Sequence, residues 1–488
     1  MSQKRIIVWY RNNLRIHDHE PLYRASQETT HLFPLYCFDD RQFQTTSYGF
    51  PKTGSYRAKF LIDSVANLRH NLSQLNSTLI IRQGLPETII PSLVKEHKIT
   101  AVYFYGEVTS EELAVEKAVK TALMNIGIPI KCFWGSTLYH IQDLPFLPEA
   151  LPTLFTNFRK AIEKKASVRE TFPQPRQLTA LTNVDCGELP KLSQWALEEP
   201  VVDPRGVLPF IGGEDAGLGR LNQYIWQQNR LKDYKITRNG MLGADYSSKF
   251  SPWLALGCLS PRFIFEAIKQ YEAERVKNQS TYWLIFELLW RDFFRLTCLK
   301  YGSNIFRPSG IQGIMLPWKE DWAEFEDWQK GLTGYPLVDA NMRELAATGF
   351  MSNRGRQNVA SFLTKNLGIN WIMGAEWFES LLIDYDVCSN WGNWNYVAGV
   401  GNDARGFRYF NIPKQSRDYD KQGHYLRHWL PEIASIPGDK IHEPGKLSRQ
   451  EQQLFSVSIG SDYPRPMVNF FKSIKQNEKL YQQAILLT

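Results

Sequence analysis

The chain has 488 residues, 43% of them hydrophobic and 22% charged, which excludes a disordered chain and predicts a globular protein of two or three domains. Its 57 Lys and Arg against 50 Asp and Glu leave a net charge of +7. A surplus of this size permits a polyanionic partner but does not require one.

The six cysteines lie far apart and form no C-x-x-C pair, which argues against a zinc site and against a disulfide framework. We therefore expect no metal. The sequence enters a strand directly after Met-Ser-Gln-Lys-Arg, without a secretory segment, and no apolar run is long enough to span a bilayer. These features predict a soluble protein of a reducing compartment, cytoplasmic or within an organelle or the nucleus.

The first third of the chain alternates short apolar runs with helical segments. The runs predict strands at residues 4–10, 31–38, 78–82, 100–105 and 128–134, and the segments between them predict helices at 56–74, 86–97 and 109–125. Continuous apolar strands separated by helices indicate a doubly wound parallel sheet covered on both faces. Ligands of such sheets lie beyond the strand C-termini. Because no G-x-G-x-x-G follows the first strand, a dinucleotide is not predicted there.

Between residues 135 and 206 the regular pattern stops. Prolines recur, and only residues 154–165 predict a helix, so we expect a long ordered connector across the surface. From residue 212 the sequence is almost wholly helical, and G-G-E-D-A-G-L-G-R-L at 212–221 predicts a helix start, because it lacks the G-K-[ST] ending of a phosphate loop. The predicted domains are residues 1–140 and 206–488, joined by a connector at 141–205.

One cluster in the helical part lies at residues 245–262. It places Ser247, Ser248 and Ser251 before an apolar helix, where hydroxyl groups can cap the helix and free backbone N–H groups can hold phosphates. An ordinary capped helix explains these residues equally well.

A second cluster lies at residues 282–295. Glu287 and Arg291 stand four residues apart on an otherwise apolar helix, with Trp290 beside them. Charges inside such a helix indicate either a buried ion pair or part of a site.

A third cluster lies at residues 334–363, where Asn353, Arg356 and Gln357 share one helical face. Tryptophan also concentrates here, since nine of the fifteen lie between residues 283 and 394. Core packing alone does not favour that excess, because buried indole N–H groups need partners.

The stretch from residue 374 to residue 410 combines acids, amides and aromatic residues. It begins as an apolar-faced helix, reaches Asp384 and Asp386, and then predicts a turn through Asn390, Gly392 and Asn393 with tryptophans interleaved. Ionised carboxylates are costly to bury unless they are paired or hydrogen-bonded. The stretch indicates a pocket for a flat, polar-edged ligand, and the alternative is a solvated helix end with aromatic core filling.

Together these segments resemble the photolyase/cryptochrome family over the whole chain. Five motifs in the family's order carry the resemblance: R-N-N-L-R-I-H-D-H-E-P-L, S-S-K-F-S-P-W-L-A-L-G-C-L-S-P-R, F-E-L-L-W-R-D-F-F-R, G-Y-P-L-V-D-A-N-M-R-E-L and D-Y-D-V-C-S-N-W-G-N-W. Motifs of this length in this order are specific. The resemblance implies an α/β antenna domain, a long linker, and a helical domain that holds a U-shaped FAD.

The family's motifs imply a role for each residue that matches them. The implied FAD-binding residues are Tyr234, Ser247, Ser248, Lys249, Phe250, Ser251, Arg291, Asn353, Arg356, Asp384, Asp386 and Asn390. Among these, Arg356 is expected to pair with Asp384, and Asn390 to face flavin N5, as in photolyases with a fully reduced, anionic flavin. The implied electron-relay residues, from flavin to surface, are Trp394, Trp371 and Trp318.

Two departures from ordinary dimer-repairing photolyases indicate the subclass. In those enzymes two tryptophans sandwich the flipped-out pyrimidine dimer, whereas here Trp290 matches the first and Tyr396 stands at the second. Gln357 occupies a position that is usually Met. Both exchanges resemble DASH-type cryptochromes. Because a weaker-stacking pocket offsets less of the cost of extruding a base from duplex, we expect repair of single-stranded DNA and only weak binding of duplex DNA.

The resemblance therefore implies a monomeric, light-driven enzyme of the deoxyribodipyrimidine photo-lyase type. The implied catalytic residues are Glu287, Trp290 and Asn353, and the implied DNA-binding residues are Trp290, Arg354, Gln357 and Tyr396. The segment Y-F-Y-G-E-V-T at 103–109 resembles the family's methenyltetrahydrofolate site, with Glu107 as the antenna contact. The competing interpretation is a blue-light photoreceptor or transcriptional regulator without physiological repair. A thermal flavin oxidoreductase has no second-substrate motif in its favour.

Overall fold

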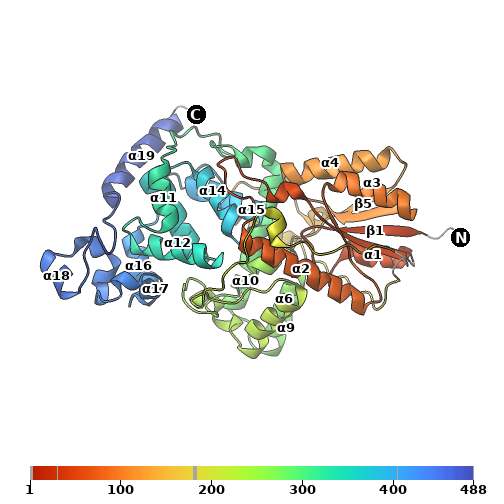
Figure 1. The fold of residues 1–488 in the computed structure, drawn as a ribbon, viewed down its shortest axis with the longest axis horizontal. Coiled ribbons are helices and arrows are strands. Elements are labelled where there is room, and N and C mark those ends of the chain that lie inside the picture. Colours follow the sequence, from red (N-terminus) through yellow and green to blue (C-terminus); the bar gives the residue numbers. More distant parts are fainter. Residues whose placement is uncertain (1–3, 30, 180–183, 404, 487–488) are drawn as a thin grey trace.

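The N-terminal part of the structure is a five-stranded parallel sheet with helices on both faces (Figure 1). The computed structural model describes residues 4–29, 31–179, 184–403 and 405–486. The strand order is β3-β2-β1-β4-β5, and every neighbouring pair is parallel. The strands are β1 Arg5–Tyr10, β2 His31–Phe38, β3 Ile80–Gln83, β4 Ala101–Tyr105 and β5 Ile130–Phe133. The predicted doubly wound sheet is confirmed.

Successive residues of β1 enter two different cores, because side chains alternate along a strand. Ile6, Val8 and Tyr10 pack into the larger core with helices α1 and α2, whereas Ile7 and Trp9 pack against α3 and α4. The helices are α1 Glu20–Glu28, α2 Ser55–Gln74, α3 Pro86–His97 and α4 Ser110–Met124. Burial on both faces explains why the strand sequences are continuously apolar.

Helix α1 begins at Glu20, within the polar segment that follows β1, and it is not among the helices predicted from the sequence. His19 is its N-cap, and the imidazole Nδ1 accepts a hydrogen bond from the Leu22 backbone N–H at 3.1 Å. Histidine is not among the usual capping residues, so the local signal for this helix start is weak.

The connector between the sheet and the helical part is ordered by contacts with both. Its described residues contain no named strand and one α-helix, α5 Phe155–Lys165, as predicted. The backbone N–H groups of Leu32 and Ile81, on β2 and β3, donate to the Thr179 and Cys186 carbonyls at 3.0 and 2.9 Å. The domain boundaries at residues 140 and 205 stay predictions.

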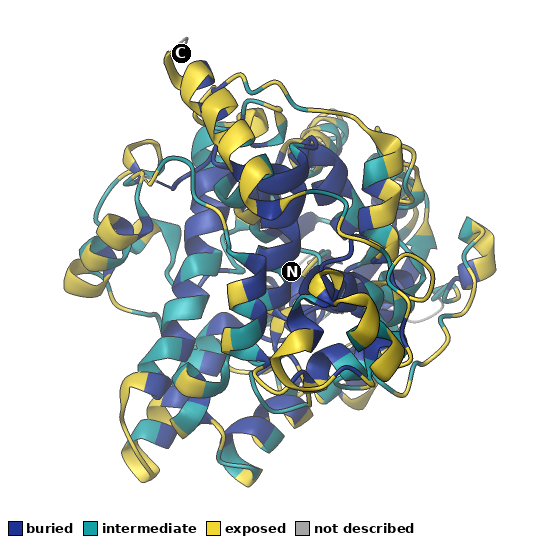
Figure 2. Ribbon diagram, turned by 90° about the vertical axis from the view of Figure 1, so that its left-hand side faces the viewer, coloured by how far each residue is buried: buried dark blue, intermediate teal, exposed yellow. Residues whose placement is uncertain are grey.

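The remainder of the chain is helical, and its longest helix, α10, packs against α5, α7, α9 and α15 (Figure 1). The helices are α6 Glu214–Asn222, α7 Tyr234–Thr237, α8 Ser251–Ala255, α9 Pro261–Glu274, α10 Gln279–Tyr301, α11 Trp322–Lys330, α12 Pro336–Thr348, α13 Asn353–Ser361, α14 Trp371–Leu381, α15 Val387–Ala398, α16 Ile412–Tyr419, α17 His424–Trp429, α18 Arg449–Leu454 and α19 Phe470–Leu486. The start of α6 confirms the helix predicted at 212–221. Buried residues lie along the inner helices, whereas α19, the last helix, is largely exposed (Figure 2).

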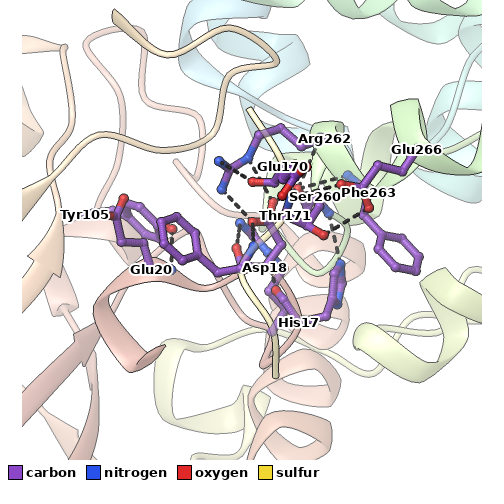
Figure 3. Close-up of polar contacts among 12 residues, drawn as sticks. His17, Asp18, Glu20, Tyr105, Glu170, Thr171, Ser260, Arg262, Phe263 and Glu266 are labelled. Atoms are coloured by element: carbon purple, nitrogen blue, oxygen red, sulfur yellow. Dashed lines mark hydrogen bonds and ion pairs between the residues drawn. The ribbon is translucent and has the colours of Figure 1, made fainter. Parts of the chain in front are cut away.

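A buried polar cluster joins the sheet to the helical part (Figure 3). The loop after β1 enters the helical part, where Asp18 pairs with Arg262 and accepts a hydrogen bond from Ser260. Glu214 accepts from the backbone N–H groups of residues 16 and 17 at 3.0 Å each, and the Arg15 guanidinium donates to the Gly257 carbonyl at 2.8 Å. The edge of the sheet where a doubly wound fold commonly binds ligand is thus used to dock the two parts.

Candidate active site

A cavity of about 470 Å³ opens in the helical part and collects most of the predicted site residues. The predicted residues that line it are Tyr234, Ser247, Ser248, Lys249, Phe250, Ser251, Glu287, Trp290, Arg291, Asn353, Arg356, Gln357, Asp384, Asp386, Asn390, Trp394 and Tyr396. Its wall comes from segments that are far apart in sequence, chiefly α8, α10, α13 and α15. A concave site of this kind, with a few convergent polar groups, is typical of cofactor binding.

Asp384 lies at the centre of the polar wall. Its Oδ2 accepts a hydrogen bond from Arg356 Nη2 at 2.9 Å and another from Ser251 Oγ at 2.6 Å. The carboxylate side chain is 2% exposed, and the Arg356 side chain is 25% exposed. The predicted Arg356–Asp384 pair is confirmed, and with Ser251 it joins α8, α13 and the loop between α14 and α15.

The predicted turn through Asn390, Gly392 and Asn393 is wrong, because these residues lie inside helix α15. Asp386 is the N-cap and accepts from the Ser389 backbone N–H at 2.7 Å, which starts the helix before the residues that usually favour turns. Gly392 serves packing instead, since a Cβ there would lie 2.3 Å from the Phe294 ring of α10. Within α15, the Asn390 side chain donates to the Ala375 carbonyl at 3.0 Å.

The serine cluster does not cap a helix through its side chains. The helix that follows it, α8, is only five residues long; its N-cap is Phe250, without a side-chain hydrogen bond, and Ser251 is used by Asp384. Between the serines, Lys249 has a φ of 55° and its Nζ lies 3.2 Å from the centroid of the Tyr246 ring. Burial lowers the pKa of Lys249 to about 6. The segment is therefore a buried, strained loop against the cavity.

Glu287 pairs with Arg238 and not with Arg291. The Glu287 Oε1 lies 2.8 Å from Arg238 Nη2, and burial raises the pKa of this carboxyl against the opposing effect of Arg238. Arg291 instead donates to the carbonyls of Ser136 and Leu254, the second at 3.1 Å. Arg238 also lines the cavity and was not among the predicted residues. It lies 49 positions before Glu287, and no local sequence pattern connects the two.

The rings of Trp290 and Tyr396 face the same cavity at right angles. Their centroids are 5.9 Å apart with 83° between the planes, and the Tyr396 hydroxyl accepts a hydrogen bond from Arg405. Gln357 lines the same cavity, whereas Arg354 does not. The Arg354 guanidinium contacts Asn239 and Gln415 and lies over Tyr419.

Comparison with known proteins identifies the fold and the family. Residues 6–176 match a family model described as DNA photolyase, and residues 283–483 match the FAD binding domain of DNA photolyase. Cryptochrome DASH of Gloeobacter violaceus is 60% identical over 484 residues, which is 99% of this chain and 97% of that protein. Cryptochrome DASH of Xenopus laevis is 53% identical over 467 residues, which is 95% of this chain and 89% of that protein. The chain belongs to the DASH-type cryptochromes of the photolyase/cryptochrome family.

Solved structures agree with this assignment. The crystal structure of the Synechocystis sp. PCC6803 cryptochrome matches with a TM-score of 0.96 and 58% identity, covering 98% of this chain and all of that one. A bacterial class III photolyase from Agrobacterium tumefaciens matches with a TM-score of 0.87 and 28% identity, covering 100% and 98%. This DASH-type cryptochrome is therefore a photolyase-like flavoprotein with an FAD-binding helical domain.

The residues of the cavity fit FAD. Asp384 Oδ1 is buried without a hydrogen-bond partner, so a ligand N–H group would satisfy it. Arg356 and Asn390 add donors on the same wall, and apolar and aromatic side chains cover the rest. An extended ligand with a flat, polar-edged ring and a charged middle matches this distribution.

The three predicted relay tryptophans differ in their position relative to the cavity. Trp394 lines the cavity and packs edge-on against Phe378, with centroids 5.1 Å apart. Trp371 and Trp318 do not line it, and their Nε1 groups donate to the same carbonyl, that of Pro308, at 3.0 and 3.1 Å. This shared acceptor holds the second and third indoles beside each other.

Glu107 lies at the carboxyl end of β4, away from the cavity. Its carboxylate pairs with Arg295 of α10 at 2.9 Å, and its backbone N–H donates to Glu116 at 2.7 Å.

All six cysteines are free thiols, and the described residues include no cluster of His, Cys, Asp and Glu placed to hold a metal ion. No helix in the described part of the chain combines the length and the apolarity needed to cross a membrane.

Proposed function

We propose that this protein uses blue light to repair cyclobutane pyrimidine dimers, preferentially in single-stranded DNA. The observation that carries the proposal is the perpendicular arrangement of Trp290 and Tyr396 at the wall of the flavin cavity. With 83° between their planes, the two rings do not present parallel faces to one base, and the phenol ring of Tyr396 offers less stacking surface than an indole. One stacking surface offsets only part of the cost of unstacking a base, so the enzyme favours lesions that are already unpaired.

The chemistry divides between the cofactor and the chain. Reduced FAD, when bound, supplies an electron to the dimer under blue light and regains it after the two carbon–carbon bonds between the pyrimidines break. Trp290 stacks on the lesion, and the Glu287 carboxyl, one turn earlier on α10, hydrogen-bonds the pyrimidine edge. Since burial raises the pKa of Glu287, this group can also hold a proton at Oε1 or Oε2 while the electron is on the dimer.

The remaining predicted residues hold the two ligands in contact. Asn353, the first residue of α13, lines the cavity and orients the flavin and the dimer through its amide. Gln357, one turn further along the same helix, gives the lesion pocket a polar edge. Arg354 is the first candidate cation for the DNA phosphates, so binding weakens as salt rises. We further propose that the enzyme acts as a monomer.

We propose methenyltetrahydrofolate as the antenna, with Glu107 as a contact. Glu107 is the acidic residue at the carboxyl end of β4, and its bond to Arg295 fixes it beside the helix that carries Trp290. Purified protein with a near-ultraviolet folate band beside the flavin bands would support this, and Glu107→Gln should lose the folate band while FAD stays bound.

The test is light-dependent repair of one cyclobutane thymine dimer, presented in single-stranded DNA and in the matching duplex. We expect clear repair of the single strand and poor repair of the duplex, with Glu287→Gln slower on both. FAD content measured beforehand serves as the control for folding. Fully reduced, FAD-loaded protein that neither binds nor repairs either substrate would refute the enzyme and leave the blue-light photoreceptor or transcriptional regulator.

A further inference from the structure

Trp290 is covered on one face by a side chain from the connector. Phe155, the first residue of α5, stacks on the indole with ring centroids 3.7 Å apart and only 8° between the planes. Phe155 is 7% exposed and does not line the cavity, whereas Trp290 does. A ring at this distance leaves no room for a base on the same face. The lesion can therefore stack only on the opposite face of Trp290.

The other aromatic neighbours of Trp290 are not stacked closely on the indole. Phe293 and Tyr396 lie edge-on at 5.8 and 5.9 Å, and Phe294 is tilted by 32° at 5.4 Å. Phe155 is thus the single closely stacked aromatic partner of Trp290 among the described residues. It decides the plane in which the indole lies.

Helix α5 is held against α10 by more than this one contact. Arg159, one turn after Phe155, donates to the Tyr282 hydroxyl at 2.6 Å, and its guanidinium lies 5.7 Å from the Phe286 ring. Phe155 also meets Phe286 edge-on at 5.1 Å. Residues 155 and 159 share one face of α5, and residues 282, 286 and 290 recur every fourth position on α10. The two rows of side chains therefore face each other where α5 packs on α10, with Phe155 against Trp290 and Arg159 against Tyr282.

We propose that Phe155 is a positioning residue of the lesion site, which fixes the indole of Trp290 so that its free face is turned to the cavity before DNA arrives. The inference rests on the proposed function. An indole held by one stacked partner loses little rotamer freedom when a base stacks on its other face, and such preorganisation strengthens binding. The connector thereby contributes to the DNA site without touching DNA.

The first experiment compares Phe155→Leu with the matched control Phe158→Leu in FAD-loaded protein. Phe158 lies on the same helix, is fully buried, and has ring contacts with Phe146, Phe155 and Phe293. Fluorescence anisotropy in the dark measures affinity for a single-stranded oligonucleotide with one thymine dimer, relative to its undamaged counterpart. We expect about a three- to ten-fold weaker preference for Phe155→Leu and less than a two-fold change for the control.

A double-mutant cycle separates positioning from general destabilisation. In a Trp290→Leu background, Phe155→Leu should have no further effect on lesion preference, because the side chain it acts through is gone. In protein labelled with 5-fluorotryptophan, the resonance missing from Trp290→Leu identifies Trp290. Phe155→Leu should split or broaden this fluorine signal, as expected of an indole that takes more than one orientation, and Phe158→Leu should not. If Phe155→Leu loses FAD, Phe155→Met takes its place in each comparison.

Lesion preference within two-fold of wild type for Phe155→Leu would overturn the inference. So would a loss that persists undiminished in the Trp290→Leu background. A wild-type protein with no preference for the damaged strand would instead refute the proposed function. In that case splitting or broadening of the Trp290 fluorine signal in Phe155→Leu still decides whether Phe155 positions Trp290, and a single sharp signal would overturn that role.

Discussion

Replacing Asp384 by alanine should empty the flavin site. The change leaves the Arg356 guanidinium and the Ser251 hydroxyl without the acceptor that both use. Removing one partner of a buried ion pair costs about 3–5 kcal/mol. Because the Arg356 side chain is 25% exposed, water recovers part of this, and we expect about 2–3 kcal/mol. This cost falls on folding. FAD binding in addition loses the buried acceptor Asp384 Oδ1, and since a hydrogen bond to a charged group is worth about 1.5–3 kcal/mol, FAD affinity falls roughly 10- to 150-fold.

The measurement is the ratio of flavin absorbance to protein absorbance after purification and after titration with added FAD. Asp384→Ala should purify largely colourless, and Asp384→Asn, which keeps an acceptor oxygen, should lose less. Asp418→Ala removes an exposed carboxylate that pairs with Lys414 on α16 and serves as the control. Stoichiometric FAD in purified Asp384→Ala protein would show that the pair does not organise the site.

Trp394→Phe should abolish photoreduction of oxidised flavin by an external donor while FAD stays bound, since Phe keeps most of the packing; unchanged photoreduction would mean another electron route. Tyr396→Trp should raise repair of duplex DNA about fivefold or more, because base–aromatic stacking is worth about 1–3 kcal/mol. Duplex repair equal to that of wild type would contradict the account in which Trp290 is the single stacking surface. Burial raises the pKa of Glu344 to about 8. The folded protein then binds more protons than the unfolded chain between about pH 4.5 and 8, so stability falls as pH rises through this range and levels off above it. In urea unfolding, Glu344→Gln should reduce the fall in the free energy of unfolding between pH 5 and 8 by roughly 3–5 kcal/mol. The control, Glu326→Gln at an exposed position, should leave that fall unchanged. The same pH dependence of unfolding free energy for wild type and Glu344→Gln would contradict the argument.

The sheet and the helices around it are predictable because their signals are local. Each strand of the sheet is a short continuous apolar run, and burial on both faces requires that composition. The start of α3 at Pro86 also has a local sequence signal, since proline is favoured in the first turn of a helix. The exception is α1, whose His19 cap has little predictive value.

The site is only partly predictable because its geometry comes from contacts between distant segments. Motif resemblance places Arg356 with Asp384, and the structure contains that pair. The spacing of Glu287 and Arg291 on α10 leaves open a buried ion pair or part of a site, and the fold pairs Glu287 with Arg238 instead. The turn predicted at Gly392 fails for a related reason, since its glycine serves the approach of Phe294 from another helix. Local patterns contain no information about such partners.

The way the two parts dock explains why the chemistry lies in the helices. Between β1 and β4, where the strand order reverses, a doubly wound sheet commonly binds its ligand. Here the loop after β1 fills that edge with Arg15 and Asp18, and the cavity left beside them, about 10 Å³, has room for roughly one water. An antenna held by Glu107 must therefore lie outside this junction. Glu107 pairs with Arg295 on the helix that also carries Glu287 and Trp290, so α10 connects the proposed antenna contact to the residues proposed to bind the lesion.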